Sequence, residues 1–153
     1  RRDVKVVYLA RGVSQHDLVD TKWVADKYSI PGDRYALFAM FRGDPSDGLP
    51  GVKGIGEKGA AIIANHFATV DEALAAARQG HSALTANLAK KIIEGEGYLA
   101  IAPTLVHCAK DVALPQIDIA MPKAPKDLSK IYAMKDEYGL GASVDRLISA
   151  LNW

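Results

Sequence analysis

The sequence has one cysteine among its 153 residues, Cys108, so no disulfide can form within the chain. Because Cys108 ends an apolar run over residues 101–108, we expect it to be a small core residue in a reducing compartment. No apolar run approaches the roughly 20 residues that a transmembrane helix needs. The first residues, 1–4, lack the hydrophobic segment of a signal peptide. These absences predict a cytoplasmic protein with no membrane partner.

Charge and metal-binding side chains show little pattern over the whole chain. The net charge is +1, so any basic surface for a nucleic acid has to be local. The four histidines share no metal-ligand spacing, which favours surface or capping roles for His16, His66, His81 and His107. Hydrophobic residues at 49% and charged residues at 24% exclude disorder, and the length suits one domain or one domain with a small appendage.

Apolar periodicity predicts a mainly helical chain that follows a short strand pair. Residues 4–10 are β-branched and aromatic, and residues 13–19 are expected to pair with them as a β-hairpin. Thr21 is predicted to cap a helix over residues 22–28, and Thr69 with Glu72 matches a capping box. Further helices are predicted over residues 34–41, 58–67, 70–78, 83–94, 98–108, 127–138 and 143–151. The aromatic residues at helical spacing are interpreted as core: Trp23, Tyr28, Tyr35, Phe38 and Phe41. Residues 115–125 have three prolines and the alternating pair Ile117 and Ile119, and are expected to be extended.

The sharpest signal is the run Gly51-Val52-Lys53-Gly54-Ile55-Gly56, which predicts the turn of a helix-hairpin-helix. Glycine is needed where φ is positive or where another backbone comes close. Ile55 is expected to fill the apolar seam between the helices while the peptide amides face outward. The free N–H groups of the helix that starts near Glu57 form an anion site, to which Lys53 and Lys58 add charge-assisted phosphate contacts. Such binding ignores base sequence and weakens steeply with salt. The alternative is a turn that only joins two packed helices.

Two aspartates, Asp44 and Asp47, stand in the turn directly before this run. Asp, Pro, Ser and Gly are the commonest turn formers, so turn chemistry alone explains their presence. Two carboxylates beside a phosphate-binding turn also suit a divalent metal near a scissile phosphate, and hard oxygen ligands favour Mg²⁺ or Mn²⁺. Both interpretations stay open at this point. Lys90 and Lys91 likewise suit either a phosphate contact or, as the favoured interpretation, a solvated helix face.

The run over residues 41–60, FRGDPSDGLPGVKGIGEKGA, resembles the second half of the 5′-nuclease family. These are the 5′→3′ exonucleases and flap endonucleases found alone in bacteria or fused to DNA polymerase I. The family pattern is roughly G-D-x-S-D-N-[IL]-P-G-V-x-G-I-G-x-K-T-A, and this chain departs from it at Gly48 and Gly59, which replace an Asn and a Thr. The resemblance implies a helix-hairpin-helix (SAM-like) helical domain over residues 21–153. Residues 1–20 would then be edge strands remaining from an α/β nuclease sheet.

The resemblance also implies which residues bind which groups. Asp44 and Asp47 would be two carboxylates of a two-metal site for Mg²⁺ or Mn²⁺. The predicted contacts to duplex DNA are Gly51, Val52, Lys53, Gly54, Ile55, Gly56 and Lys58. Similar hairpins imply that the carbonyls of Pro50, Val52 and Ile55 hold a monovalent cation, K⁺, that bridges to a phosphate. The implied substrates are 5′ flaps, nicks and exposed 5′ ends in replication and repair.

The half of the family that carries most of the acidic ligands is expected to precede Arg1. Asp3, Asp17 and Asp20 have no ligand spacing and are interpreted as solvated strand and turn residues. This chain alone is therefore predicted to bind duplex DNA weakly and to cleave nothing. Its expected partners are DNA, the missing nuclease half and a DNA polymerase. The rival hypothesis is a non-catalytic helix-hairpin-helix DNA-binding module, which shares the glycine turn but gives the two aspartates no metal.

Overall fold

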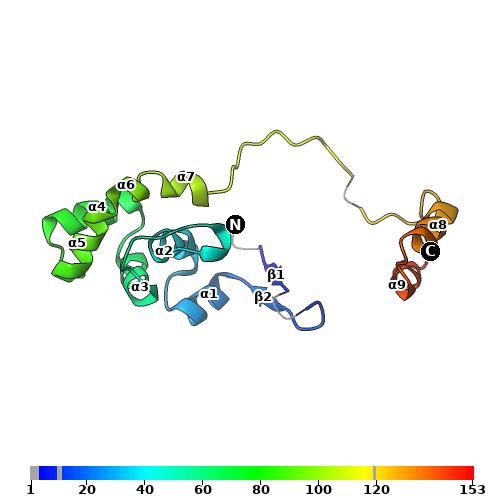
Figure 1. The fold of residues 1–153 in the computed structure, drawn as a ribbon, viewed down its shortest axis with the longest axis horizontal. Helices are drawn as coiled ribbons and strands as arrows, with labels where there is room; N and C mark the ends of the chain where they lie inside the picture. The colour runs from blue at the N-terminus through cyan, green and yellow to red at the C-terminus, as the bar shows by residue number, and fades with distance from the viewer. Residues whose placement is uncertain (1–3, 10–11, 119) are drawn as a thin grey trace. The chain divides into compact units, whose positions relative to one another are not determined.

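The computed structural model describes residues 4–9, 12–118 and 120–153, and it is predominantly helical (Figure 1). The prediction of a mainly helical chain with an N-terminal β-hairpin is confirmed. Contacts divide the chain into two compact units, residues 1–110 and residues 111–153. Across the described residues, every helix is too short or too polar to span a bilayer. The boundary expected at residue 20 stays a prediction.

The β-hairpin is shorter than its sequence pattern predicts. Strands β1 (Val6–Tyr8) and β2 (Asp17–Val19) pair antiparallel, with Val6 opposite Val19. The Gln15 amide donates to the Gly12 carbonyl at 3.2 Å, and Gly12 has a φ of 98°, so a turn replaces the start of the expected second strand. Residues 1–3 and 10–11 of the expected edge lie outside the described residues. The apolar side chains of the hairpin remain about half exposed: Val6, Val7, Tyr8 and Leu18.

Helix α1 (Thr21–Tyr28) starts one residue earlier than predicted, because Asp20 and not Thr21 is its N-cap. The Asp20 carboxylate accepts a hydrogen bond of 2.8 Å from the Trp23 amide. A carboxylate in this position satisfies one of the free N–H groups of the first turn, and it also opposes the positive end of the helix dipole. This bond is the main reason that the pKa of Asp20 lies below its ordinary value. Asp20 is therefore a helix cap.

Two helix pairs enclose the core of the first unit. The helices are α2 (Tyr35–Arg42), α3 (Glu57–His66), α4 (Val70–Gln79) and α5 (Ala86–Glu94), and a 3₁₀ turn, η1 (Gly32–Arg34), precedes α2. Helix α2 packs against α3, and α4 packs against α5 (Figure 1). The largest fully buried side chains are Phe38, Met40, Phe41, Ile63, Ile92 and Leu99. Of the aromatic residues expected in the core, Phe38 and Phe41 are buried, whereas Trp23, Tyr28 and Tyr35 are partly exposed. The four histidines are exposed, as predicted.

The predicted capping box at α4 is present in a shifted form. The Thr69 hydroxyl accepts from the Glu72 amide at 3.1 Å, while the Glu72 carboxylate accepts from the Ala68 amide at 2.6 Å. Helix α5 starts at Ala86 instead of residue 83, because Thr85 caps it through the Leu88 amide.

The prediction of a single helix over residues 98–108 is wrong. The chain forms two short helices there, α6 (Glu96–Leu99) and α7 (Ala102–Val106). Pro103 has no N–H group to donate, so it is tolerated in the first turn of α7 but not within a continuous helix. Cys108 is exposed, which corrects its assignment to the core. Helix α7 ends at Val106 and His107 is extended, so Cys108 lies beyond the packed helices of its unit.

The second unit is a helical hairpin that follows an irregular segment. Helices α8 (Leu128–Glu137) and α9 (Ala142–Leu151) pack together, and Val144 and Ile148 of α9 are buried. The Lys135 ammonium lies 2.7 Å from the Asp145 carboxylate and links the two helices. The described residues of the predicted extended segment, 115–118 and 120–125, have no regular structure, and Ile119 lies outside the described residues.

Candidate nucleic-acid interface and acidic turn

Two of the three glycines of the turn between α2 and α3 have the backbone that the sequence predicts, whereas Gly56 has a φ of −96° and open surroundings. Gly51 and Gly54 have φ values of 68° and 79°, in the left-handed region that favours glycine. The Ile55 amide donates to the Val52 carbonyl at 2.9 Å, which closes the turn. Val52 and Ile55 are buried, whereas Lys53, Gly54, Gly56 and Lys58 are exposed. The two apolar side chains therefore fix the turn to the core and leave its two lysines, Gly54 and Gly56 accessible to solvent.

Gly51 also allows two backbone segments to touch. A Cβ atom added at Gly51 would lie 2.5 Å from the Gly43 amide nitrogen and 2.7 Å from the Arg42 carbonyl oxygen. The Val52 amide donates to the Phe41 carbonyl at 3.0 Å beside this contact. The end of α2 is consequently joined to the start of the turn with no room for a side chain, and the acidic turn that follows α2 is held next to the glycine-rich one.

The N-terminus of α3 is open. Gly56 is its N-cap, and no side chain among the described residues caps its first turn. The first N–H groups of a helix lack intrahelical partners and carry the positive end of the helix dipole. With Lys53 and Lys58 exposed nearby in the sequence, this end of α3 has the properties of an anion site. Gly59, in the first turn of α3, comes close to Ile55, since an added Cβ would lie 3.2 Å from Ile55 Cγ2.

The chain repeats this turn between α4 and α5. Gly80 has a φ of 68°, and the Leu84 amide donates to the His81 carbonyl at 2.9 Å, as Ile55 does to Val52. Leu84 is buried as Ile55 is. Here, however, the Thr85 hydroxyl accepts from the Leu88 amide at 3.2 Å and caps the helix. The only signal of this second turn in the sequence is a glycine followed four residues later by an aliphatic residue.

The end of α5 contacts the glycine-rich turn of the first pair. The Lys91 ammonium donates to the Gly54 carbonyl at 2.8 Å. A Cβ atom added at Gly95 would lie 2.7 Å from Val52 Cγ1. These contacts join positions about forty residues apart in the sequence, so the local pattern gave no indication of them.

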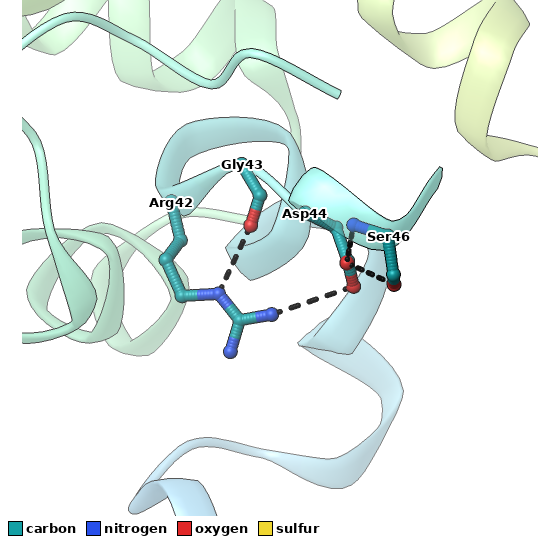
Figure 2. Close-up of polar contacts among 4 residues, drawn as sticks. All are labelled: Arg42, Gly43, Asp44 and Ser46. Atoms are coloured by element: carbon teal, nitrogen blue, oxygen red, sulfur yellow. Dashed lines mark hydrogen bonds and ion pairs between the residues drawn. The ribbon is translucent and has the colours of Figure 1, made fainter. Parts of the chain in front are cut away.

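The acidic turn is built around Asp44. The backbones of Asp44 and Leu49 exchange two hydrogen bonds of 2.9 Å, and a 3₁₀ turn, η2 (Pro45–Asp47), lies between them. Figure 2 shows how the Asp44 carboxylate is held: its Oδ1 accepts from the Ser46 hydroxyl at 2.6 Å and from the Ser46 amide at 3.2 Å. Arg42 approaches Oδ2 at 3.6 Å through Nη2 and donates to the Gly43 carbonyl through Nε at 3.1 Å.

These contacts favour the charged form of Asp44. The Ser46 hydroxyl is the largest cause that lowers the pKa of this carboxyl, and the Ser46 amide and the positive charge of Arg42 lower it further against a desolvation cost. Sequence reasoning missed both Arg42 and Ser46 as partners of Asp44. A hydrogen bond to a residue two positions away is typical of an Asp turn, so the Ser46 contact was open to prediction.

Asp47 and Asp44 line the same surface recess. This recess is lined by both aspartates together with Tyr35, Ala36, Ala39, Gly48, Leu49, Leu105 and Val106. Gly48 has a φ of 69°, and an added Cβ would meet no atom within 4 Å, so the backbone accepts Gly or Asn there. In the described part of the chain, no group of three or more His, Cys, Asp or Glu side chains is placed to hold a metal ion. Two carboxylates match the oxygen ligands that Mg²⁺ prefers, but they are only part of such a site.

The open turn, its capped repeat and the packing of α2 to α5 define a helix-hairpin-helix domain of the SAM-like class. A family model described as the C-terminal SAM fold of 5′-3′ exonucleases matches residues 30–128. The chain belongs to this 5′-3′ exonuclease family.

Known relatives agree with this membership. A 5′-3′ exonuclease of Streptomyces coelicolor is 42% identical over 150 residues, which are 98% of this chain and 50% of the relative. A DNA polymerase I of Mycobacterium bovis is 33% identical over 97% of this chain and 16% of its own length. Flap endonuclease Xni of Pseudoalteromonas translucida is 31% identical over 63% of this chain and 35% of its own length. The chain spans about half the length of the exonucleases that it matches.

Proposed function

We propose that the chain is the C-terminal part of a divalent-metal-dependent 5′→3′ exonuclease and flap endonuclease that acts on DNA in replication and repair. Its part is to hold duplex DNA and to supply two carboxylates of the metal site. One observation carries the proposal. The glycine-rich turn, which leads into the open N-terminus of α3, touches the acidic turn of Asp44 and Asp47 where Gly51 meets Gly43. The names of the relatives, which include 5′-3′ exonucleases and a flap endonuclease, support the proposed reaction class.

The DNA contacts proposed for the turn are contacts to phosphate. The exposed residues Lys53, Gly54, Gly56 and Lys58 present backbone amides and two ammonium groups at the start of α3. Gly51, Val52 and Ile55 shape this backbone. Backbone amides and lysines bind phosphate oxygens without reading bases, so the binding is independent of sequence and decreases with salt. The carbonyls of Pro50, Val52 and Ile55 remain the proposed ligands of a bridging K⁺ ion.

The metal part of the proposal assigns Asp44 and Asp47 to Mg²⁺ or Mn²⁺. When bound, such an ion activates a water molecule and neutralises charge at the scissile phosphate. Ser46 and Arg42 orient the Asp44 carboxylate, and the lowered pKa of Asp44 keeps it charged and able to bind a cation. Two carboxylates do not complete a two-metal site, so we propose that the remaining ligands come from the other half of the full-length protein. The half-exposed apolar side chains of β1 and β2 are the proposed contact to that half.

Binding is tested with this chain and a fluorescent nicked or 5′-flap duplex. Replacing Lys53 and Lys58 together by alanine is expected to weaken binding and to reduce the slope of log K against log salt by about 0.9 for each lost contact. The matched control, K22A with K110A, removes the same charge outside the turn and is expected to leave the slope near wild type. Equal losses in both double variants would contradict a phosphate site at this turn.

The metal assignment is tested by two separate measurements. In this chain, Mn²⁺ is expected to broaden the amide NMR signals of Asp44 and Asp47, and D44N with D47N is expected to remove the effect. In a protein that includes the other half, the same double variant is expected to abolish cleavage while retaining DNA binding. Retained cleavage would favour the rival hypothesis, a non-catalytic helix-hairpin-helix module. Mg²⁺-dependent flap cleavage by this chain alone would contradict the division of ligands between the two halves.

A further inference from the structure

Lys91 of α5 reaches the glycine-rich turn from the other helix pair. Its Nζ atom donates a hydrogen bond of 2.8 Å to the Gly54 carbonyl, across 37 residues of sequence. Its Cε atom would lie 3.1 Å from a Cβ added at Gly54, so its aliphatic stem also packs over this position. The side chain is half-buried, and this contradicts the favoured sequence interpretation of Lys91 as part of a solvated face.

The adjacent lysine of the same helix behaves differently. The Lys90 side chain is 73% exposed, and its ammonium pairs with Glu94 one turn further along α5 at 3.8 Å. Lys91 instead lines a recess with Val52, Lys53, Gly54, Glu94 and Gly95. The two neighbouring lysines carry equal charge but have different partners: Lys90 pairs with Glu94, whereas Lys91 contacts the turn.

The direction of the Gly54 carbonyl affects the geometry of the whole turn. The Gly54 C=O and the Ile55 N–H belong to one planar peptide unit, so the direction of one fixes the direction of the other. The Ile55 N–H closes the turn on the Val52 carbonyl, and the next amide, that of Gly56, opens the anion site of α3. Gly54 has a φ of 79° and no side chain, so its own conformational preferences do little to hold this peptide in place. An ammonium on its carbonyl supplies that restraint.

We propose that Lys91 is a positioning residue: it fixes the 54–55 peptide through the Gly54 carbonyl and thereby orients the amides that bind phosphate. The role in DNA binding rests on the proposed function, whereas the restraint on the turn does not. Lys91 acts through the turn and makes no phosphate contact of its own in this assignment.

The restraint is tested in the free protein by hydrogen exchange of the Ile55 amide. Lys91→Met keeps the stem and removes the donor, and it is expected to speed this exchange about fivefold. The internal control is the Leu84 amide, which makes the same hydrogen bond in the second turn. Exchange at Leu84 is expected to be unchanged, and a general loss of stability would accelerate both amides. Lys90→Met is the matched control variant, and Lys91→Arg, which keeps a charged donor, is expected to stay within about twofold of wild type.

The DNA role is tested with the same variants and a nicked duplex. Lys91→Met is expected to weaken binding about fivefold more than Lys90→Met, with the same slope of log K against log salt. Unchanged Ile55 exchange together with a slope reduced by about 0.9 would overturn the proposal in favour of a direct phosphate contact. Equal acceleration at Ile55 and Leu84 would overturn it as well. If the wild-type chain binds no DNA, the proposed function fails, and the exchange experiment still decides whether Lys91 holds the turn.

Discussion

Gly95 faces Val52 so closely that a Cβ atom added at Gly95 would lie 2.7 Å from Val52 Cγ1 and 3.0 Å from Cγ2. Val52 is buried in the glycine-rich turn, while Gly95 ends α5, so this contact sets the distance between the second helix pair and the turn.

Gly95→Ala is therefore expected to destabilise the chain by about 1–3 kcal/mol, because the added methyl group overlaps a buried valine and one of the two groups has to shift. Shortening the opposing side chain should relieve the clash. The double variant with Val52→Ala is therefore expected to lose less unfolding free energy than the two single variants lose together. Urea unfolding of the two single variants and the double variant gives this coupling. Strict additivity would show that the two positions do not press on each other.

Gly51 and Gly80 have the same φ of 68° but different surroundings. A Cβ at Gly51 would overlap the backbone of residues 42 and 43, whereas a Cβ at Gly80 meets nothing within 4 Å. Gly80→Ala is expected to cost only the left-handed conformation, about 1 kcal/mol, and Gly51→Ala clearly more, since two backbone segments must separate. Urea unfolding measures both variants. Equal losses of stability would argue against the close approach at Gly51.

Ser46→Ala is expected to raise the pKa of Asp44 toward its ordinary value, because the Ser46 hydroxyl is the largest cause that lowers it. A smaller rise is expected for Arg42→Gln, since the charge of Arg42 contributes less. With its pKa lowered in the folded state, Asp44 favours folding above its unfolded pKa, and this contribution is lost as the pH falls through the folded pKa. A carboxyl ¹³C NMR titration follows the group directly. A larger shift for Arg42→Gln than for Ser46→Ala would contradict this ranking.

Gly48→Asn is expected to be tolerated, with a change in unfolding free energy within about 0.5 kcal/mol. The position is left-handed and its surroundings are open, so the asparagine of the family pattern has both a compatible backbone and space. Thermal unfolding compares this variant with Gly48→Val, whose β-branched side chain resists positive φ and is expected to cost more. Comparable losses for asparagine and valine would show that another constraint acts at this turn.

Local rules predicted much of the fold and the candidate site. The capping pair of Thr69 and Glu72, the burial of Ile55 and the positive φ of Gly54 depend on residue type and spacing over a few positions. Where local rules competed, prediction was less accurate. Asp20 and Thr21 are both good caps, and only the placement of the Trp23 amide shows that Asp20 is used. The break between α6 and α7 could have been predicted from Pro103, because proline is not tolerated in the interior of a continuous helix.

The sequence by itself determined that the chain is mainly helical, that a glycine-rich turn with two lysines joins two helices, and that two aspartates precede it, because glycine conformation and apolar spacing act within a few residues. Only the tertiary structure decided that Lys91 contacts Gly54, that Gly95 presses on Val52, that the turn between α4 and α5 repeats the first one, and that Cys108 is exposed. These features depend on how separate helices pack, and packing brings together residues that no short pattern connects.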